Sequence, residues 1–452
     1  MQTTSISAPL SMRRIAAGAA LALGLAAPLS AHTAGGAASP DPCHVGVYRL
    51  ASGGWVDVGT TSDGGMRWRL PDGRTGLLRV AAEGKIESTR GWTGAPDGTQ
   101  VSFGACEEGR IAFAGETGAK QAFEVVETTF EGAGGIKLAG RLVLPKGSGP
   151  VPVSVMVHGS EDYSARAHYF EPRVWPAEGV GVFVYDKRGA GGSEGKYTQD
   201  FRVLAEDAAA AAREARRLAG ARAARLGFDG GSQAGWIVPL AATKVEVDYL
   251  VIRYGLAEGP LAEDRGETLR RLKDKGWGPD VLAKAAKVTD ATAKVMVSRF
   301  TDFSELNALR EHWGGEPWWQ DLEGEFTGLI AKAPEAAVRA IGPQQDKGTT
   351  WEHDPMPVLR QVKAPILWLI AGEDLEAPPE ETKARLVGLA KEGRNITVLE
   401  FPDTDHGIRE FETDDGKRVY TRYADGYYAA VLDFTRTGEA AGTYGAARRL
   451  TP

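Results

Sequence analysis

The feature that most constrains the fold is a run of small residues between two apolar segments, at residues 225–239. The part up to Asp229 is typical of a short buried strand, and the part from Ala234 onward of a helix start. Ser232 stands between them, with Gly230 and Ala234 at the two positions where a larger side chain would clash. The pattern predicts a tight, strained strand–turn–helix in which the Ser232 hydroxyl projects above a sheet edge.

An apex serine of this kind needs a partner base, because a free hydroxyl is a poor nucleophile. His406 lies in a polar loop after the apolar run that ends at Phe401, and it is the only histidine after the apolar segment 365–370. A single histidine in a loop is most often a solvated side chain, but its position in the chain order favours a base. We therefore predict His406 as the general base.

The acid that orients this base should follow a strand at the same sheet edge. Asp374 follows the apolar segment 365–370 directly, and its carboxylate would hold the imidazole in one tautomer. Glu373 and Glu376 are local competitors, and the spacing to Pro378 favours Asp374. The expected catalytic residues are thus Ser232, Asp374 and His406, in this order along the chain.

Negative charge that develops on a substrate carbonyl oxygen needs fixed hydrogen-bond donors. We expect one donor to be the backbone N–H of Gln233, directly after the serine at a helix start, and the other to be that of Ser160. Gly159 would let the second loop approach closely. His158 precedes Ser232 in the chain, so we expect it to orient this loop rather than to act as the base.

Motifs for cofactors and metals are not visible. The glycine-rich segment 186–193 lacks the G-K-[ST] ending of a phosphate-binding loop, so we predict that it supports the site structurally. The sequence shows neither a dinucleotide fingerprint nor a metal-ligand spacing, and the predicted chemistry requires no cofactor or metal. With a formal net charge of -7 and no basic tract, the chain is not expected to bind nucleic acid.

Strand and helix patterns alternate through most of the chain. Apolar strands are expected near 151–157, 179–185, 245–252, 365–370 and 396–399, with helices at about 203–218 and 379–391 and a closing helix at about 419–435. This alternation predicts a mostly parallel sheet with helices on both faces, the α/β class. The segment from about 255 to 355 interrupts it, reads as mostly helical, contains several tryptophans, and is expected to form a lid.

The N-terminal part has a different character. Residues 43–124 alternate with period two between glycine-rich turns and predict a small all-β domain, which is either a packing appendage or a binding module. Residues 1–31 contain Arg13 and Arg14 before an apolar run that is short and rich in small residues, which predicts a secretory signal peptide rather than a membrane anchor. The two cysteines, Cys43 and Cys106, are then expected to form a disulfide, the alternative being two free thiols.

With these motifs in place, residues 125–440 resemble the α/β-hydrolase superfamily. The resemblance rests on His158-Gly159-Ser160, Asp186-Lys187-Arg188-Gly189 and the Gly-Ser-Gln-small-Gly-Trp elbow at Ser232. It implies a serine hydrolase of exported bacterial type. Two residues depart from the usual pattern, namely Ala234 and Ala371, each where glycine is common.

Three functions are compatible with these observations. The leading one is cleavage of a small carboxylic (acyl) ester through a covalent acyl-enzyme. The expected location is the periplasm or outside the cell. The second is a serine aminopeptidase or dipeptidyl-peptidase-like activity on short peptides, for which Glu161, Asp162 or a carboxylate of the insert could hold the substrate amine. The third is a non-catalytic binding protein on a hydrolase scaffold, against which the complete set of three catalytic residues argues.

Overall fold

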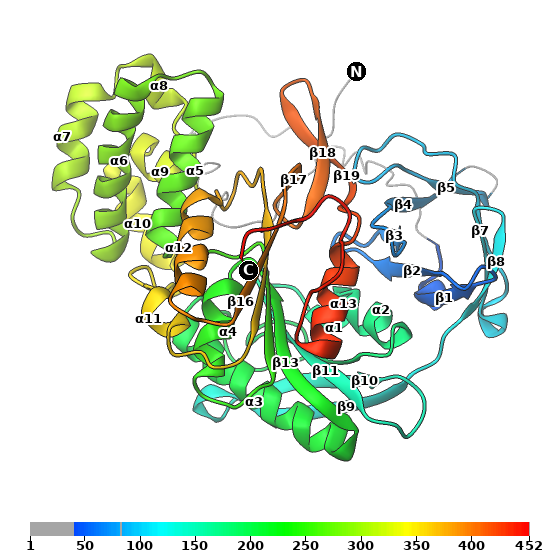
Figure 1. Ribbon diagram of the computed structural model, residues 1–452. Helices are drawn as coiled ribbons and strands as arrows, with labels where there is room; N and C mark the ends of the chain where they lie inside the picture. Colours follow the sequence, from blue (N-terminus) through cyan, green and yellow to red (C-terminus); the bar gives the residue numbers. More distant parts are fainter. Residues whose placement is uncertain (1–39, 82–83, 452) are drawn as a thin grey trace, which may run out of the picture. The chain divides into compact units, whose positions relative to one another are not determined.

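The computed structural model describes residues 40–81 and 84–451 and divides into two compact units (Figure 1). One unit contains the segment Leu261–Asp346, and the other contains Ser39–Pro260 and Lys347–Pro452. The predicted signal peptide lies outside the described residues. No helix in the described ranges is long and apolar enough to cross a membrane.

The N-terminal all-β prediction is confirmed, and the strands close into a barrel. Its eight strands pair in chain order, and the barrel closes where the first strand pairs antiparallel with the last, Tyr48 opposite Lys120. The strands are β1 (Gly46–Leu50), β2 (Trp55–Thr60), β3 (Met66–Arg69), β4 (Thr75–Val80), β5 (Ile86–Ser88), β6 (Val101–Phe103), β7 (Arg110–Phe113) and β8 (Glu116–Lys120). A cluster of buried apolar side chains that includes Val56, Trp68 and Phe113 fills the interior, so the barrel is a packed core rather than a channel.

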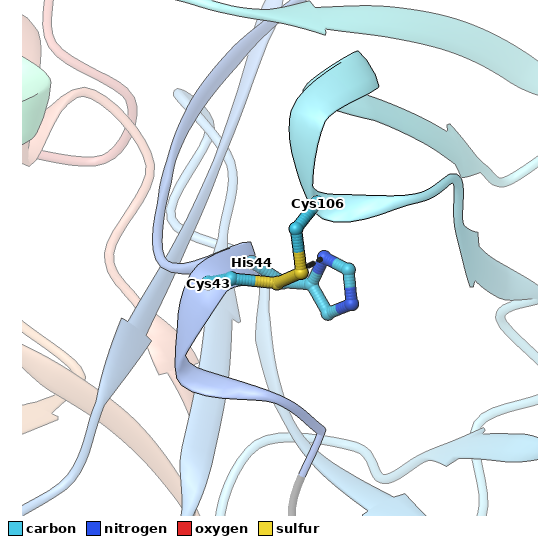
Figure 2. Close-up of side chains that lie close together, drawn as sticks. All are labelled: Cys43, His44 and Cys106. Carbon is cyan, nitrogen blue, oxygen red and sulfur yellow. Dashed lines mark hydrogen bonds between the residues drawn. A yellow bond between two sulfur atoms is a disulfide. The ribbon is translucent and has the colours of Figure 1, made fainter.

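The predicted disulfide between Cys43 and Cys106 is present, with 5.7 Å between the two Cα atoms. Figure 2 shows it beside the ring of His44, whose Nδ1 lies 3.6 Å from the sulfur of Cys43. Such a group of two cysteines and a histidine resembles a metal site. Here the two sulfurs are bonded to each other and are not the thiolates that a metal needs.

The second part of the same unit is built on a nine-stranded sheet. Strands β11 to β16 run parallel to one another, whereas β9, β10 and β20 pair antiparallel at the edges. In spatial order the sheet reads β20 (Arg448–Arg449), β16 (Ile396–Phe401), β15 (Ile366–Ala371), β14 (Tyr249–Arg253), β13 (Ala223–Gly231), β11 (Val151–Val157), β12 (Gly181–Tyr185), β10 (Lys137–Leu144) and β9 (Glu124–Glu131).

Helices cover both faces of this sheet, as predicted, because alternate side chains of the central strands are apolar on both sides. Phe228 and Trp368 belong to the apolar cluster that also contains side chains of α3 (Phe201–Ala219), α4 (Ala234–Ala242) and α12 (Glu380–Lys391). Val251 and Leu369 belong to the cluster of the other face, with α2 (Glu171–Ala177) and α13 (Tyr427–Thr437). Because β11 to β16 are parallel, their carboxyl ends lie at one edge of the sheet, where ligand-binding and active sites form in sheets of this type.

The segment between β14 and β15 is mostly helical, as expected. Its elements are α5 (Pro260–Asp274), α6 (Pro279–Val297), α7 (Ser304–Trp313), α8 (Pro317–Gln320), α9 (Thr327–Lys332), α10 (Glu335–Gln345) and α11 (Met356–Leu359). Trp318 and Trp319 are buried and Trp277 donates a hydrogen bond to Asp321. These tryptophans therefore stabilise the core of the insert.

One element differs from its prediction. The expected closing helix at about 419–435 begins only at Tyr427, and the residues before it form a β-hairpin. The hairpin consists of β18 (Arg409–Asp414) and β19 (Lys417–Tyr423), and the short β17 (Thr404–Asp405) pairs with it. Lys417–Tyr423 is rich in β-branched and aromatic residues, namely Val419, Tyr420, Thr421 and Tyr423, so it pairs as a strand once β18 lies beside it.

Candidate active site

The turn at Ser232 has the predicted strained form. Strand β13 ends at Gly231 and α4 begins at Ala234, and Ser232 between them adopts a φ of 56°, a left-handed conformation that costs a non-glycine residue on the order of 1–3 kcal/mol. Two hydrogen bonds hold the turn: the N–H of Ser232 donates to Arg253 O (2.9 Å), and its carbonyl accepts from the N–H of Gly235 (2.8 Å). The Ser232 side chain remains partly exposed.

Gly230 explains how the turn accommodates the methyl group of Ala234. A Cβ on residue 230 would lie 2.5 Å from the Ala234 Cβ and 2.7 Å from Val157 O. Glycine at 230 therefore provides the space that the methyl group of Ala234 occupies. For this reason the turn tolerates alanine at 234, where glycine is usual.

Asp374 and His406 meet where β15 and β17 end. The Nδ1–H of His406 donates to Asp374 Oδ2 at 2.9 Å, while Asp374 Oδ1 accepts the N–H groups of Glu376 (3.0 Å) and Ala377 (2.8 Å). The Asp374 side chain is buried, which raises the pKa of its carboxyl although the nearby His406 opposes the shift. This arrangement fixes the tautomer in which Nε2 carries the free lone pair.

Glu376 was considered from the sequence only as an alternative to Asp374 as the acid. In the structure it lies beside the other ring nitrogen of His406. Its Oε1 lies 3.7 Å from Nε2 of His406, on the side of the ring away from Asp374. Burial alone would lower the pKa of His406, but the charges of Glu376 and Asp374 raise it to about 9. No sequence pattern distinguishes Glu376 from Glu373 in this respect.

Tyr254 connects the serine turn with the imidazole. Its ring packs edge-on against His406, with 4.9 Å between centroids, and a Cβ on Gly231 would lie 2.5 Å from the same ring. Within the described ranges no hydrogen bond joins Ser232 to His406.

The loop at residues 158–160 passes close to the serine. A Cβ on Gly159 would lie 3.6 Å from the Ser232 Cβ, so glycine permits this close approach. The backbone N–H groups of Ser160 and Gln233 donate no hydrogen bond to any described residue, which leaves both available for a substrate oxygen. His158 donates from Nε2 to Tyr185 O (2.6 Å) and is buried, which lowers its pKa to about 4, so it is a neutral structural group.

Lys187 holds the loop at residues 158–160 through hydrogen bonds. The sequence predicted only that segment 186–193 supports the site, without assigning a role to Lys187. Its buried ammonium donates to the carbonyls of Gly159 (2.5 Å) and Glu161 (2.9 Å). Burial lowers the pKa of Lys187 to about 8, with Glu161 opposing the shift. Two charge-assisted bonds, to the carbonyls on either side of Ser160, hold these peptide groups in one orientation.

Comparisons with known proteins give one family match. The model of the acetyl xylan esterase (AXE1) family matches residues 112–211, which include the loop at Gly159 and end before Ser232. No curated protein matches the chain.

Solved structures with a similar chain path include two archaeal enzymes. An acylaminoacyl peptidase from Pyrococcus horikoshii aligns at 16% identity with a TM-score of 0.40, over 78% of this chain and 52% of that chain, so this chain spans about half the length of that peptidase. An esterase from Pyrococcus furiosus aligns at 17% identity with a TM-score of 0.39, over 63% of this chain and 85% of that chain.

A third structure is brefeldin A esterase, described as a bacterial homologue of human hormone sensitive lipase. It aligns at 16% identity with a TM-score of 0.41, over 64% of this chain and 70% of that chain. The sheet order and the strained serine turn are typical of the α/β-hydrolase fold, and the esterase-family match agrees with them. The described residues thus have an α/β-hydrolase fold, and residues 112–211 within it match an esterase family.

Proposed function

We propose that this chain is a serine hydrolase that cleaves carboxylic esters through a covalent acyl-enzyme, with Ser232 as nucleophile, His406 as base and Asp374 as its orienting acid. The observation that carries the proposal is the hydrogen bond from His406 Nδ1 to Asp374, 2.9 Å long, which turns the basic Nε2 away from the acid. A strained apex serine held next to the loop of Gly159 supplies the matching nucleophile.

In the first half-reaction Ser232 Oγ bonds to the ester carbonyl carbon while its proton passes to His406 Nε2. Collapse of the tetrahedral intermediate breaks the bond to the alkoxy oxygen, which takes that proton and leaves as an alcohol. In the second half, water gives a proton to His406 and attacks the acyl carbon. The acid is then released and Ser232 regains its proton.

The oxygen that becomes negative in both halves would lie between the N–H groups of Gln233 and Ser160. Lys187 contributes indirectly, since it binds the carbonyls of Gly159 and Glu161 and so sets the direction of the amide that follows Gly159. Each preorganised donor of this type is worth roughly 3–4 kcal/mol of transition-state stabilisation.

The family match to acetyl xylan esterases favours short acyl groups, so acetyl esters are the first substrates to test. We propose that the helical insert between β14 and β15, at about 255–355, selects the substrate as a lid. We further propose that residues 125–440 form the catalytic domain, with the barrel at about 43–124 as a separate domain.

A peptidase activity is the second candidate, and one observation favours it. The carboxylate of Glu376 is 41% exposed beside His406 Nε2 and could hold a substrate amine. Glu161, considered for that purpose from the sequence, is half-buried and already accepts a hydrogen bond from Tyr169, so it is a poorer candidate than Glu376.

A fluorophosphonate probe tests the chemistry directly. We expect labelling of the wild type and of Ser52→Ala, a control serine on the exposed surface of the barrel, and none of Ser232→Ala. An unlabelled wild type would leave a non-catalytic binding protein as the better interpretation. Rates on p-nitrophenyl acetate and butyrate, compared with aminoacyl and dipeptidyl anilides, then separate the esterase from the peptidase.

We also propose that the chain is exported after removal of residues 1–31. The disulfide between Cys43 and Cys106 supports this, because such bonds persist in oxidising compartments. Expression of the full chain followed by fractionation and N-terminal mass determination tests it, and an intact N-terminus in the cytosolic fraction would contradict it.

A further inference from the structure

The β18–β19 hairpin begins directly after the proposed base. His406 is followed by Gly407 and Ile408 with φ of 87° and 55°, two consecutive left-handed residues that turn the chain sharply into β18. Arg409 Nε then donates back to His406 O at 2.6 Å, and Ala424 N–H at the far end of the hairpin donates to Ile408 O at 3.0 Å. The position of the imidazole is thus tied to the position of the hairpin.

The barrel holds the other side of this hairpin. The backbone N–H of Trp92, in the barrel, donates to Tyr420 O (2.8 Å), and the Trp92 ring packs edge-on against Tyr420 and Tyr423. Arg90 forms two hydrogen bonds with Glu412, of 2.6 and 2.5 Å. In Figure 1 the hairpin carries the labels β18 and β19.

The backbones of the barrel and of β19 approach each other so closely at Gly91 that no side chain would fit there. A Cβ on Gly91 would lie 2.3 Å from Thr421 O, and the N–H of Tyr423 donates to Gly73 O at 2.9 Å. Two turns of the barrel therefore contact β19 directly, and β19 cannot shift without moving them.

Asp405 joins the hairpin to both catalytic loops. Its Oδ1 accepts the N–H of Leu375, next to Asp374, and the N–H of His406, at 3.0 and 2.8 Å. From β19, Arg418 pairs with Oδ1 (3.2 Å) and Tyr420 donates to Oδ2 (3.1 Å). Burial would raise the pKa of Asp405, but the N–H of Leu375 and the charge of Arg418 hold it below its ordinary value, so the carboxylate stays ionised.

We propose that the barrel is a positioning element for catalysis, in which Trp92 and Arg90 hold the β18–β19 hairpin and Asp405 transmits that position to His406 and Asp374. The inference rests on the proposed function, since it assigns a consequence to the placement of the base. None of these three residues is one of the proposed catalytic residues or oxyanion donors. Their loss should therefore lower kcat and leave KM almost unchanged, because a small misplacement of a catalytic group reduces the rate of the chemical step.

The test compares Trp92→Ala and Trp92→Phe in the full chain on p-nitrophenyl acetate. We expect kcat of Trp92→Ala to fall roughly 10- to 100-fold with KM within about twofold, and Trp92→Phe to restore most of it because a ring still packs against Tyr420. The downfield proton resonance of the His406–Asp374 bond, identified by its loss in Asp374→Asn, should broaden or disappear in Trp92→Ala.

Glu412→Gln provides a milder variant that removes only a surface ion pair and should fold. Its matched control is Arg360→Gln, because Arg360 and Glu392 form an equally exposed two-bond pair, of 2.8 and 3.0 Å, at the ends of α11 and α12. We expect Glu412→Gln to lower kcat a few-fold, about 2- to 5-fold, and Arg360→Gln to leave it unchanged.

The outcomes separate the two ideas. If fluorophosphonate does not label the wild type, the proposed function is wrong, whatever the barrel does. If the wild type is labelled and His406→Ala is inactive, but Trp92→Ala and Glu412→Gln keep the wild-type kcat and resonance, the positioning role is overturned. If Trp92→Ala does not fold, Glu412→Gln against Arg360→Gln decides.

Discussion

Replacement of Glu376 by glutamine should shift the pH dependence of catalysis. The base must be neutral to accept the serine proton, and kcat/KM reports the ionisation of the free enzyme. Because the pKa of His406 is raised to about 9, only roughly 1% of the imidazole is neutral at about pH 7. The wild-type enzyme should therefore gain activity as the pH rises, with a midpoint near 9.

The size of the shift follows from the geometry. A charge within about 4–6 Å moves a pKa by roughly 1–3 units, and the lower end applies here because Glu376 is partly exposed. The other groups that act on His406 are Asp374, which also raises its pKa, and Arg409, which lowers it, and both remain in the variant. A pKa lower by about one unit corresponds to about tenfold more neutral imidazole at about pH 7.

The assay is kcat/KM on p-nitrophenyl acetate between about pH 5 and pH 10, corrected for spontaneous hydrolysis. We expect the rising limb of Glu376→Gln to move down by about one unit, with about tenfold higher activity near neutral pH. The control is Glu373→Gln, which removes a carboxylate from the same loop; the Glu373 carboxylate lies 4.0 Å from Arg418. An unchanged or upward-shifted limb in Glu376→Gln, or the same shift in Glu373→Gln, would refute the reasoning.

Three further changes test other parts of the structure. Asp374→Asn should reduce kcat by roughly 10⁴-fold with little loss of stability, because the amide favours the wrong tautomer of His406; a small loss in steady-state kinetics would contradict this. Gly230→Ala should destabilise the protein by about 1–3 kcal/mol in urea unfolding, because its Cβ would lie 2.5 Å from Ala234; Ala234→Gly in the same chain should recover part of that loss, and no recovery would show that the contact with Val157 O dominates. Cys106→Ser should lower the free energy of unfolding by about 2–4 kcal/mol, and an unchanged thermal midpoint would show that the disulfide adds nothing.

Local sequence determined the parts of this protein whose cause is local. Small residues at 230 and 234 around Ser232 predict the turn, because only they fit where a strand reverses into a helix. Alternating apolar strands predict the sheet and a small all-β domain, and two cysteines in a chain with a predicted signal peptide predict their bond. Asp374 and His406 were also predicted from their places after strands, and the structure brings them together.

Tertiary structure decided what depends on partners distant in the chain. The segment at Val419 was expected to be helical, and it became β19 because β18 and the barrel offer it hydrogen bonds and aromatic contacts. Glu373 and Glu376 are alike in sequence, and only the fold of the loop places Glu376 beside Nε2 of His406. Lys187 is a loop residue in the sequence, and only the packed sheet buries its ammonium beneath Gly159. In each case, which groups lie within a few ångströms of one another is decided by long-range packing, which local patterns do not encode.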